Sequence, residues 1–127
     1  MSYQTALLLT TDRELEKTCW DVSPEGWLFV ARDPGEALQV VCQQGKELDL
    51  AVIDFGEGCH GMSLLSAVQI CRPGLPILVV ISNDTYRAAA VAYANGVDAV
   101  LAKPVTTEEL GIVINKLTKP KLLLEAA

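Results

Sequence analysis

Two charged residues stand at the ends of apolar segments and are the best candidates for chemistry in this chain. Asp54 follows the apolar run Leu50–Ile53, and Lys103 follows the run Ala99–Ala102. If the two runs are neighbouring strands, the carboxylate and the ammonium group meet at one edge of a sheet. On spacing alone, a structural ion pair is the favoured interpretation. The pair could also act on a phosphoryl group, with Asp54 as nucleophile and Lys103 holding the incoming oxygens.

The elements that must position these residues follow a rhythm that recurs along the chain. Short runs rich in Leu and Val alternate with longer amphipathic segments. The five runs are Ala6–Leu9, Trp27–Ala31, Leu50–Ile53, Ile77–Ile81 and Ala99–Ala102. Apolar runs without polar alternation are typical of strands buried on both faces, and the stretches between them are long enough for helical crossovers. The sequence therefore predicts an α/β fold, a (βα)5 doubly wound parallel five-stranded sheet with helices on both faces.

Three of the expected helices begin with capping signals. The segments Thr11–Glu14 and Thr106–Glu109 each predict a capping box, in which a threonine hydroxyl and a glutamate satisfy backbone N–H groups reciprocally. Asp33 followed by Pro34 predicts an N-cap and a proline at the first helical position.

The length and charge of the chain indicate one soluble domain. Its 127 residues are 50% hydrophobic and carry a formal net charge of −6, which disfavours direct contact with nucleic acid. The longest apolar run, Leu75–Ile81, is far shorter than the roughly 20 residues of a membrane span, and no signal-peptide pattern opens the chain. We therefore expect a cytoplasmic domain over residues 1–118, followed by a tail or the start of a linker over residues 119–127.

The cysteines do not predict a metal site. The chain has one His and no Cys-x-x-Cys pair, whereas zinc sites use about four N or S ligands in short paired spacings. Cys19, Cys42 and Cys71 fall in apolar helical patterns, where a free cysteine behaves as a small hydrophobe. Cys59-His60 is the one pair expected to be exposed.

Four segments, in their order along the chain, resemble the receiver domain of two-component response regulators. They are Ala6–Asp12, Leu50–Asp54, Leu75–Ser82 and Asn95–Pro104. The last is the most specific, because a small residue and glycine followed by an apolar strand and Lys-Pro is a hallmark of that family. The resemblance extends from about Ala6 to Leu117.

The resemblance implies a fold and a role for each matching residue. The strand order would be 2-1-3-4-5, with the first and fifth helices on one face. Asp54 would accept a phosphoryl group from a histidine kinase, and Lys103 would be the conserved lysine of the fifth strand. The bond between Lys103 and Pro104 would be cis, which is uncommon, at about 5–6% of X–Pro bonds.

The chain departs from the family at the acidic pair that normally holds Mg²⁺ with the phosphoacceptor. Thr10 and Thr11 occupy those two positions, and an acid arrives only at Asp12. Hydroxyl groups are poorer Mg²⁺ ligands than carboxylates, so any binding of the metal should be weak. The groups left for Mg²⁺ are Asp54 and Gly56, with Asp12 and Glu57 as possible compensating acids.

A second departure concerns the hydroxyl that normally contacts the phosphoryl oxygen and carries the signal. Ile81 stands at its position and cannot donate a hydrogen bond. Ser82, the next residue, could substitute only if the end of the strand shifts.

These departures favour an atypical receiver that is not an enzyme and acts through contacts with a histidine kinase, an output domain or another protein. A weak homodimer through the fourth helix, fifth strand and fifth helix is expected. The alternative is a small cofactor-binding or enzymatic domain of flavodoxin-like fold. Against it, the segment Thr10–Glu14 that would cradle a phosphate has two hydroxyls but no glycine.

Overall fold

The computed structural model describes residues 3–56, 61–82 and 86–118. Glu57, the Cys59-His60 pair and the tail 119–127 lie outside the described residues. The strands are β1 (Thr5–Leu9), β2 (Trp27–Ala31), β3 (Leu50–Asp54), β4 (Ile77–Ile81) and β5 (Ala99–Ala102). The helices are α1 (Arg13–Val22), α2 (Pro34–Gln44), the short 3-10 helix η1 (Gly45–Glu47), α3 (Gly61–Cys71), α4 (Tyr86–Ala94) and α5 (Thr107–Leu117).

The five strands form one parallel sheet in the order β2-β1-β3-β4-β5, which confirms the predicted fold class. The register aligns the strand ends: Leu9 pairs with Ile53, Asp54 with Val80, and Ile81 with Ala102. The residues that follow β1, β3, β4 and β5 therefore meet at one edge, which we call the carboxyl edge. The opposite end of the strands is the amino edge.

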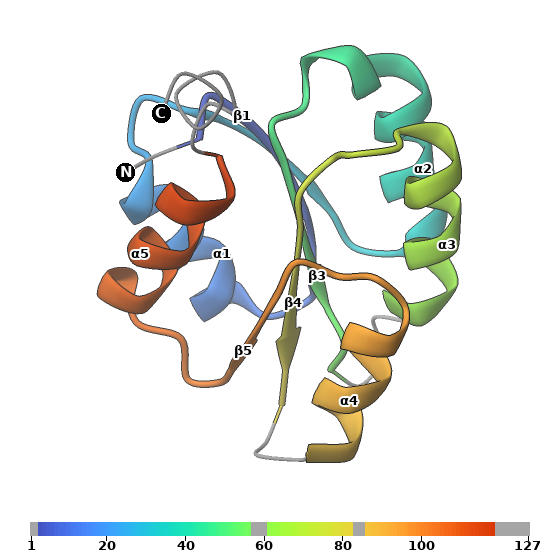
Figure 1. The fold of residues 1–127 in the computed structure, drawn as a ribbon. Coiled ribbons are helices and arrows are strands. Elements are labelled where there is room, and N and C mark those ends of the chain that lie inside the picture. The colour runs from blue at the N-terminus through green and yellow to red at the C-terminus, as the bar shows by residue number, and fades with distance from the viewer. Residues whose placement is uncertain (1–2, 57–60, 83–85, 119–127) are drawn as a thin grey trace, which may run out of the picture.

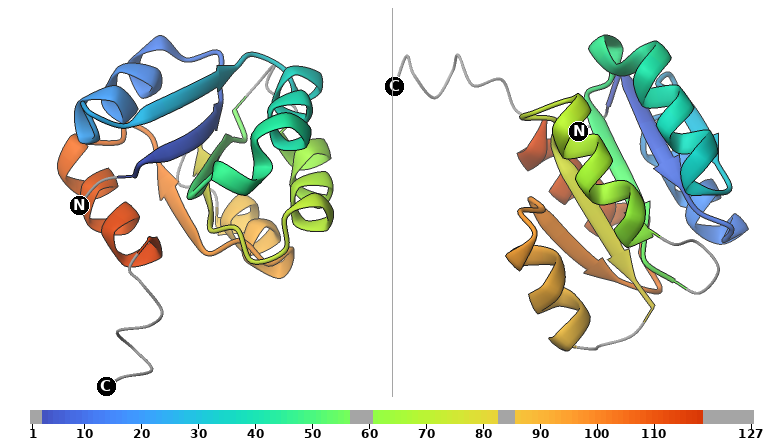
Figure 2. Two further views of the ribbon diagram at one scale, coloured as in Figure 1. Left: turned by 90° about the horizontal axis from the view of Figure 1, so that it is seen from above. Right: turned by 90° about the vertical axis from the view of Figure 1, so that its right-hand side faces the viewer.

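Helices cover both faces of the sheet (Figure 1). Helices α1 and α5 contact each other on one face, and α2, α3 and α4 lie on the other, as both views of Figure 2 also show. Alternate strand residues face the two layers: Leu7 and Leu9 point into the core under α2 and α3, whereas Leu8 points into the core under α1 and α5. Strands buried on both faces explain why the runs carry no polar alternation.

The local start signals of two helices act as predicted. Thr106 and Glu109 form a capping box on α5, and Asp33 caps α2 with Pro34 at the first helical position. The prediction for α1 was wrong by one residue, because Asp12 is the N-cap and accepts hydrogen bonds from the backbone N–H groups of the first turn. The Asp12 carboxylate, one position nearer the helix than Thr11, accepts hydrogen bonds from these groups directly.

The cysteine prediction was partly wrong. Cys19 is buried in the core under α1 and α5, as expected for a small hydrophobe. Cys42 and Cys71 are exposed thiols near the ends of α2 and α3, because each helix reaches the rim of the core at its last turn. Among the described residues, no helix is long and apolar enough to cross a membrane.

Candidate functional site

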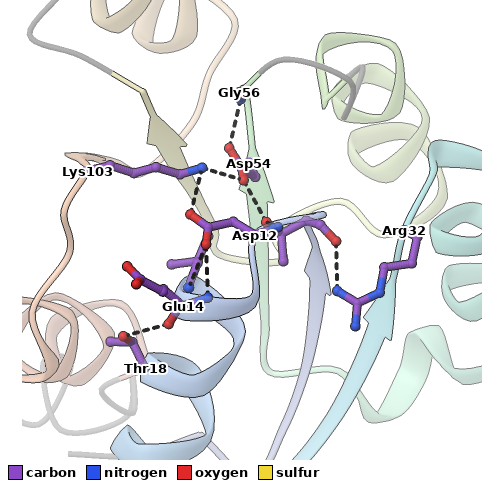
Figure 3. A network of polar contacts seen from close by, with 9 residues as sticks. Asp12, Glu14, Thr18, Arg32, Asp54, Gly56 and Lys103 are labelled. Atoms are coloured by element: carbon purple, nitrogen blue, oxygen red, sulfur yellow. Dashed lines mark hydrogen bonds and ion pairs between the residues drawn. The ribbon is translucent and has the colours of Figure 1, made fainter.

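Asp54 ends β3 at the carboxyl edge, and its side chain is 0% exposed. Its Oδ1 accepts a hydrogen bond from the backbone N–H of Gly56 at 2.7 Å. Its Oδ2 accepts two more, from Thr10 Oγ1 at 2.6 Å and from Lys103 Nζ at 2.9 Å (Figure 3). A buried carboxylate needs such donors, because an unpaired charge in a low-dielectric interior is strongly destabilising. Both oxygens of Asp54 are therefore engaged within the protein.

Thr10 follows β1 and is buried beside Asp54. Its Oγ1 accepts a hydrogen bond from the backbone N–H of Asp12 at 2.9 Å and donates its proton to Asp54 Oδ2. A hydroxyl has a single proton to donate, so this pairing fixes its direction. A carboxylate at this position would repel the negative charge of Asp54, whereas the Thr10 hydroxyl donates a hydrogen bond to it. Thr11, by contrast, is exposed.

Lys103 follows β5 and connects two carboxylates. Its Nζ lies 2.9 Å from Asp54 Oδ2 and 3.1 Å from Asp12 Oδ2 (Figure 3). Burial alone would lower the pKa of Lys103, but hydrogen bonds and charge attraction from Asp54 and Asp12 outweigh it and raise that pKa. The amine is therefore held in its charged form. The peptide bond between Lys103 and Pro104 is cis, as the sequence resemblance implied.

Asp12 is both a helix cap and the second partner of Lys103. Its Oδ1 accepts hydrogen bonds from the N–H groups of Glu14 at 2.9 Å and Leu15 at 3.4 Å. Burial tends to raise the pKa of Asp12, but the hydrogen bonds from Lys103 and these two amides, with the Lys103 charge, lower it. The structure thus brings Asp12 to the site, with its carboxylate committed to local partners.

The donor set does not fit the Mg²⁺ ion that the fold family implies. Mg²⁺ favours octahedral oxygen ligands with one or two carboxylates. The carboxylates of Asp12 and Asp54 are both bound to Lys103 Nζ, and Thr10 contributes only a neutral hydroxyl whose proton points at Asp54. Within residues 3–56, 61–82 and 86–118, no group of three or more His, Cys, Asp and Glu side chains could hold a metal ion.

The structure places Ser82, and not Ile81, beside this cluster. Ile81 is 5% exposed and lies in the core under α2 and α3. A Cβ added to Gly56 would lie 3.0 Å from Ser82 Oγ, 2.9 Å from Asp54 Oδ1 and 3.3 Å from Lys103 Nζ. The side chains of Asp54, Ser82 and Lys103 therefore surround the space beside Gly56 that any other residue would fill with its Cβ. Ser82 and Lys103 also line an adjoining pocket of about 360 Å³.

Sequence reasoning missed Arg32, which supports the cluster from the end of β2. Its Nη1 donates to the Thr10 carbonyl at 3.2 Å (Figure 3). Its Nη2 forms an ion pair with Glu16 Oε1 at 2.6 Å. These contacts tie the segment after β1 to both β2 and α1. The available signal was its position: like Lys103, Arg32 is a charge directly after an apolar run.

Comparisons with known proteins agree with this architecture, although no family model matches the chain. The chain is 29% identical over 115 residues to the transcriptional regulatory protein GlrR of Escherichia coli K12, and equally to QseF of Escherichia coli O157:H7. Each match covers 87% of this chain and 26% of the relative, so the chain spans about a quarter of their length.

Solved structures show the same fold over nearly the whole chain. A response regulator receiver domain protein from Clostridium thermocellum superposes with a TM-score of 0.82 at 20% identity, covering 98% of this chain and 99% of that protein. The receiver domain of the Francisella response regulator 1452 gives 0.78 at 25% identity, covering 91% and 97%. NtrX from Brucella abortus gives 0.84 at 18% identity, covering 99% of this chain and 29% of NtrX.

Fold and site together define a receiver-type α/β domain: a parallel sheet in the order 2-1-3-4-5 whose third strand ends on a buried aspartate beside a lysine and a cis-proline. With the sequence matches to two regulators, this makes the chain similar to receiver domains of two-component response regulators.

Proposed function

We propose that this receiver acts in a two-component or related pathway through protein contacts, with weak or no Mg²⁺-dependent phosphorylation at Asp54. The observation that carries this proposal is the pairing at Asp54 Oδ2, which accepts hydrogen bonds from both Thr10 and Lys103. Phosphoryl transfer depends on positioning and on neutralising the charge of the incoming group. Here the nucleophilic oxygen is buried and occupied, and the neutral Thr10 stands in place of an acid.

The partners of this domain would be a histidine kinase, an output domain or another regulator protein. The domain would bind no nucleic acid directly, because its net charge of −6 repels phosphate backbones. It would act in the cytoplasm and catalyse no reaction of its own. In the segment that would cradle a cofactor phosphate, the Thr10 hydroxyl bonds to Asp54 and the Asp12 carboxylate pairs with Lys103. Because these groups are occupied within the domain, they support a signalling module over a flavodoxin-like enzyme.

A weak homodimer would form through the face of α4, β5 and α5. These two helices leave large apolar side chains exposed: Val91, Tyr93 and Ile112. Sedimentation equilibrium over a range of concentrations tests this, and we expect a reversible increase in mass at high concentration that Tyr93→Ser weakens. A strictly monomeric protein at millimolar concentration would refute the dimer.

The phosphorylation proposal is tested by titrating the protein with beryllofluoride and Mg²⁺ while amide NMR signals are followed. We expect no saturable shift at Gly56 or Ser82 in the unmodified protein. Saturable shifts that disappear in Asp54→Asn would contradict the proposal.

A gain-of-function variant provides the matched control. Replacing Thr10 and Thr11 together by Asp restores two carboxylates after β1, and Mg²⁺ should then bind more tightly. We expect saturable beryllofluoride shifts in this variant alone. If the double variant responds no better than the unmodified protein, the missing acidic pair is not what limits the site.

A further inference from the structure

A second cavity lies at the amino edge, far along the strands from Asp54. It has a volume of about 670 Å³ and is formed by the last turns of α2 and α3 together with η1. Its lining includes Cys42, Lys46, Glu47, Cys71 and Arg72. None of these residues belongs to the cluster around Asp54.

The cavity brings together two thiols from segments far apart in the sequence. Cys42 lies two residues before the end of α2, and Cys71 is the last residue of α3; both are free and exposed. Helices α2 and α3 contact each other and lie side by side in Figures 1 and 2. Both helices run from the carboxyl edge to the amino edge, so their last turns end next to each other.

Helical spacing places each cysteine on the same side of its helix as a residue that packs in the core. Cys42 lies one turn after Leu38, which packs against the core, and Cys71 lies three residues after Val68, which is fully buried. Residues three or four apart share one face of a helix. Each cysteine therefore extends the inward face of its helix to the rim, where it reaches solvent.

Arg72 links the two segments that frame this cavity. Its Nη1 donates hydrogen bonds to the carbonyl of Gly45 and, at 2.9 Å, to the carbonyl of Leu48, and so ties the end of α3 to the segment after α2. Arg72 and Lys46 carry positive charges at the cavity, against the single negative charge of Glu47. The net charge of this lining suits a small anionic molecule.

We propose that Cys42 and Cys71 form a dithiol site that exchanges with small anionic disulfides such as oxidised glutathione. One protein thiolate attacks a sulfur of the disulfide, forms a mixed disulfide and releases one small thiolate. The second protein thiolate attacks the protein sulfur of that mixed disulfide and releases the other. Two protein thiols are oxidised, one disulfide is reduced to two thiols, and their protons pass to the departing thiolates.

The product is a disulfide that joins α2 to α3 at the amino edge. It would not involve Asp54, and it goes beyond the proposed function. Reversible disulfides in reducing compartments are typically transient and redox-sensing, which matches two exposed thiols more closely than a structural bond does.

The test treats the whole chain with oxidised glutathione, blocks remaining thiols by alkylation and maps the peptides by mass spectrometry without reduction. We expect a linked pair of peptides containing Cys42 and Cys71, lower in mass by about 2 Da, or two hydrogen atoms, than the two reduced peptides. Dithiothreitol should reverse the link. Cys59→Ser, made in parallel, should leave the reaction unchanged.

Two single variants separate this proposal from nonspecific oxidation. In Cys42→Ser and in Cys71→Ser, the remaining thiol of the pair should retain bound glutathione, because the second attack has no nucleophile. An unchanged circular dichroism spectrum shows that each variant is folded. Independent glutathione adducts on both cysteines of the unmodified protein, a link through another cysteine, or no reaction would each overturn the proposal.

Discussion

The two edges of the sheet use polar side chains in opposite ways. At the carboxyl edge, Thr10, Asp54 and Lys103 bond to one another in a cluster whose central carboxylate is 0% exposed. At the amino edge, Cys42 and Cys71 reach solvent at the rim of a cavity. Buried polar groups that hydrogen-bond to one another contribute to the stability of the fold, so changing one of them is costly. Exposed thiols can react with little effect on that stability.

The difference follows from burial and charge. Within the described residues, no buried side-chain nitrogen or oxygen lacks a hydrogen-bond partner. Removing Thr10 or Lys103 would leave the buried carboxylate of Asp54 with one donor fewer. The amino edge has no buried charge at its two thiols, so substitution there should leave the fold almost unchanged. Variants at the two edges therefore test this contrast.

The largest effect is expected for Lys103→Met, which leaves the buried Asp54 with neutral donors only. Breaking one partner of a buried ion pair costs about 3 kcal/mol in the free energy of unfolding, measured by urea denaturation. Lys17→Met, at an exposed position of α1, is the matched control and should cost less than about 0.5 kcal/mol. Equal losses in the two variants would show that the Lys103 pair adds no stability.

Thr10→Val should have the next largest effect, because it keeps the shape of the side chain and removes the donor to Asp54 Oδ2. Leaving a buried acceptor with one donor fewer costs about 2 kcal/mol by the same measurement. Thr10→Ser retains the hydroxyl and should recover most of that loss. A serine variant no more stable than the valine variant would assign the effect to packing instead.

A smaller, pH-dependent effect is expected at Asp12. Its pKa is lowered in the folded protein, so its charge adds stability above the unfolded pKa of about 3.9, and this is lost as the pH falls through the folded value. Asp12→Asn keeps an N-cap of similar strength and removes the charge. Because Asp12 is 31% exposed, we expect a difference of about 0.5 kcal/mol at pH 7 that disappears as the pH falls through the lowered pKa of the folded protein.

Urea denaturation of both proteins between pH 2 and pH 8 measures this effect. Asp33→Asn is the control, because Asp33 caps α2 without contact to Lys103. A constant difference between Asp12→Asn and the unmodified protein across this range would contradict the assignment.

The strands were predictable because burial on both faces leaves a strong local signal. The predicted runs Trp27–Ala31, Ile77–Ile81 and Ala99–Ala102 match β2, β4 and β5, and β1 and β3 each differ by one residue. Asp54 and Lys103 could also be placed at one edge, because each ends an apolar run. Such inferences need only the order of strands and the direction of the chain.

Contacts that depend on the direction of a side chain could not be predicted from the sequence in the same way. Thr11 and Asp12 are both good caps, and only the start of α1 decides which one reaches the amides. Arg32 and Ser82 join the cluster through the geometry of loops that the sequence does not specify. Cys42 follows the apolar pattern of α2, but its exposure depends on where the neighbouring helix ends.

The smallest effect is expected for Cys42→Ser and Cys71→Ser in the reduced protein. Both side chains are exposed, so each change should alter the free energy of unfolding by less than about 0.5 kcal/mol in urea denaturation. Cys19→Ser is the contrasting variant and should cost about 2 kcal/mol, because Cys19 is 1% exposed in the core. Burial, with the nearby Glu16 charge, raises the pKa of Cys19 to about 12, so this thiol stays protonated and should resist alkylation in the folded protein. If Cys42 and Cys71 instead resist alkylation as strongly as Cys19, the amino edge is closed and the contrast between the two edges fails.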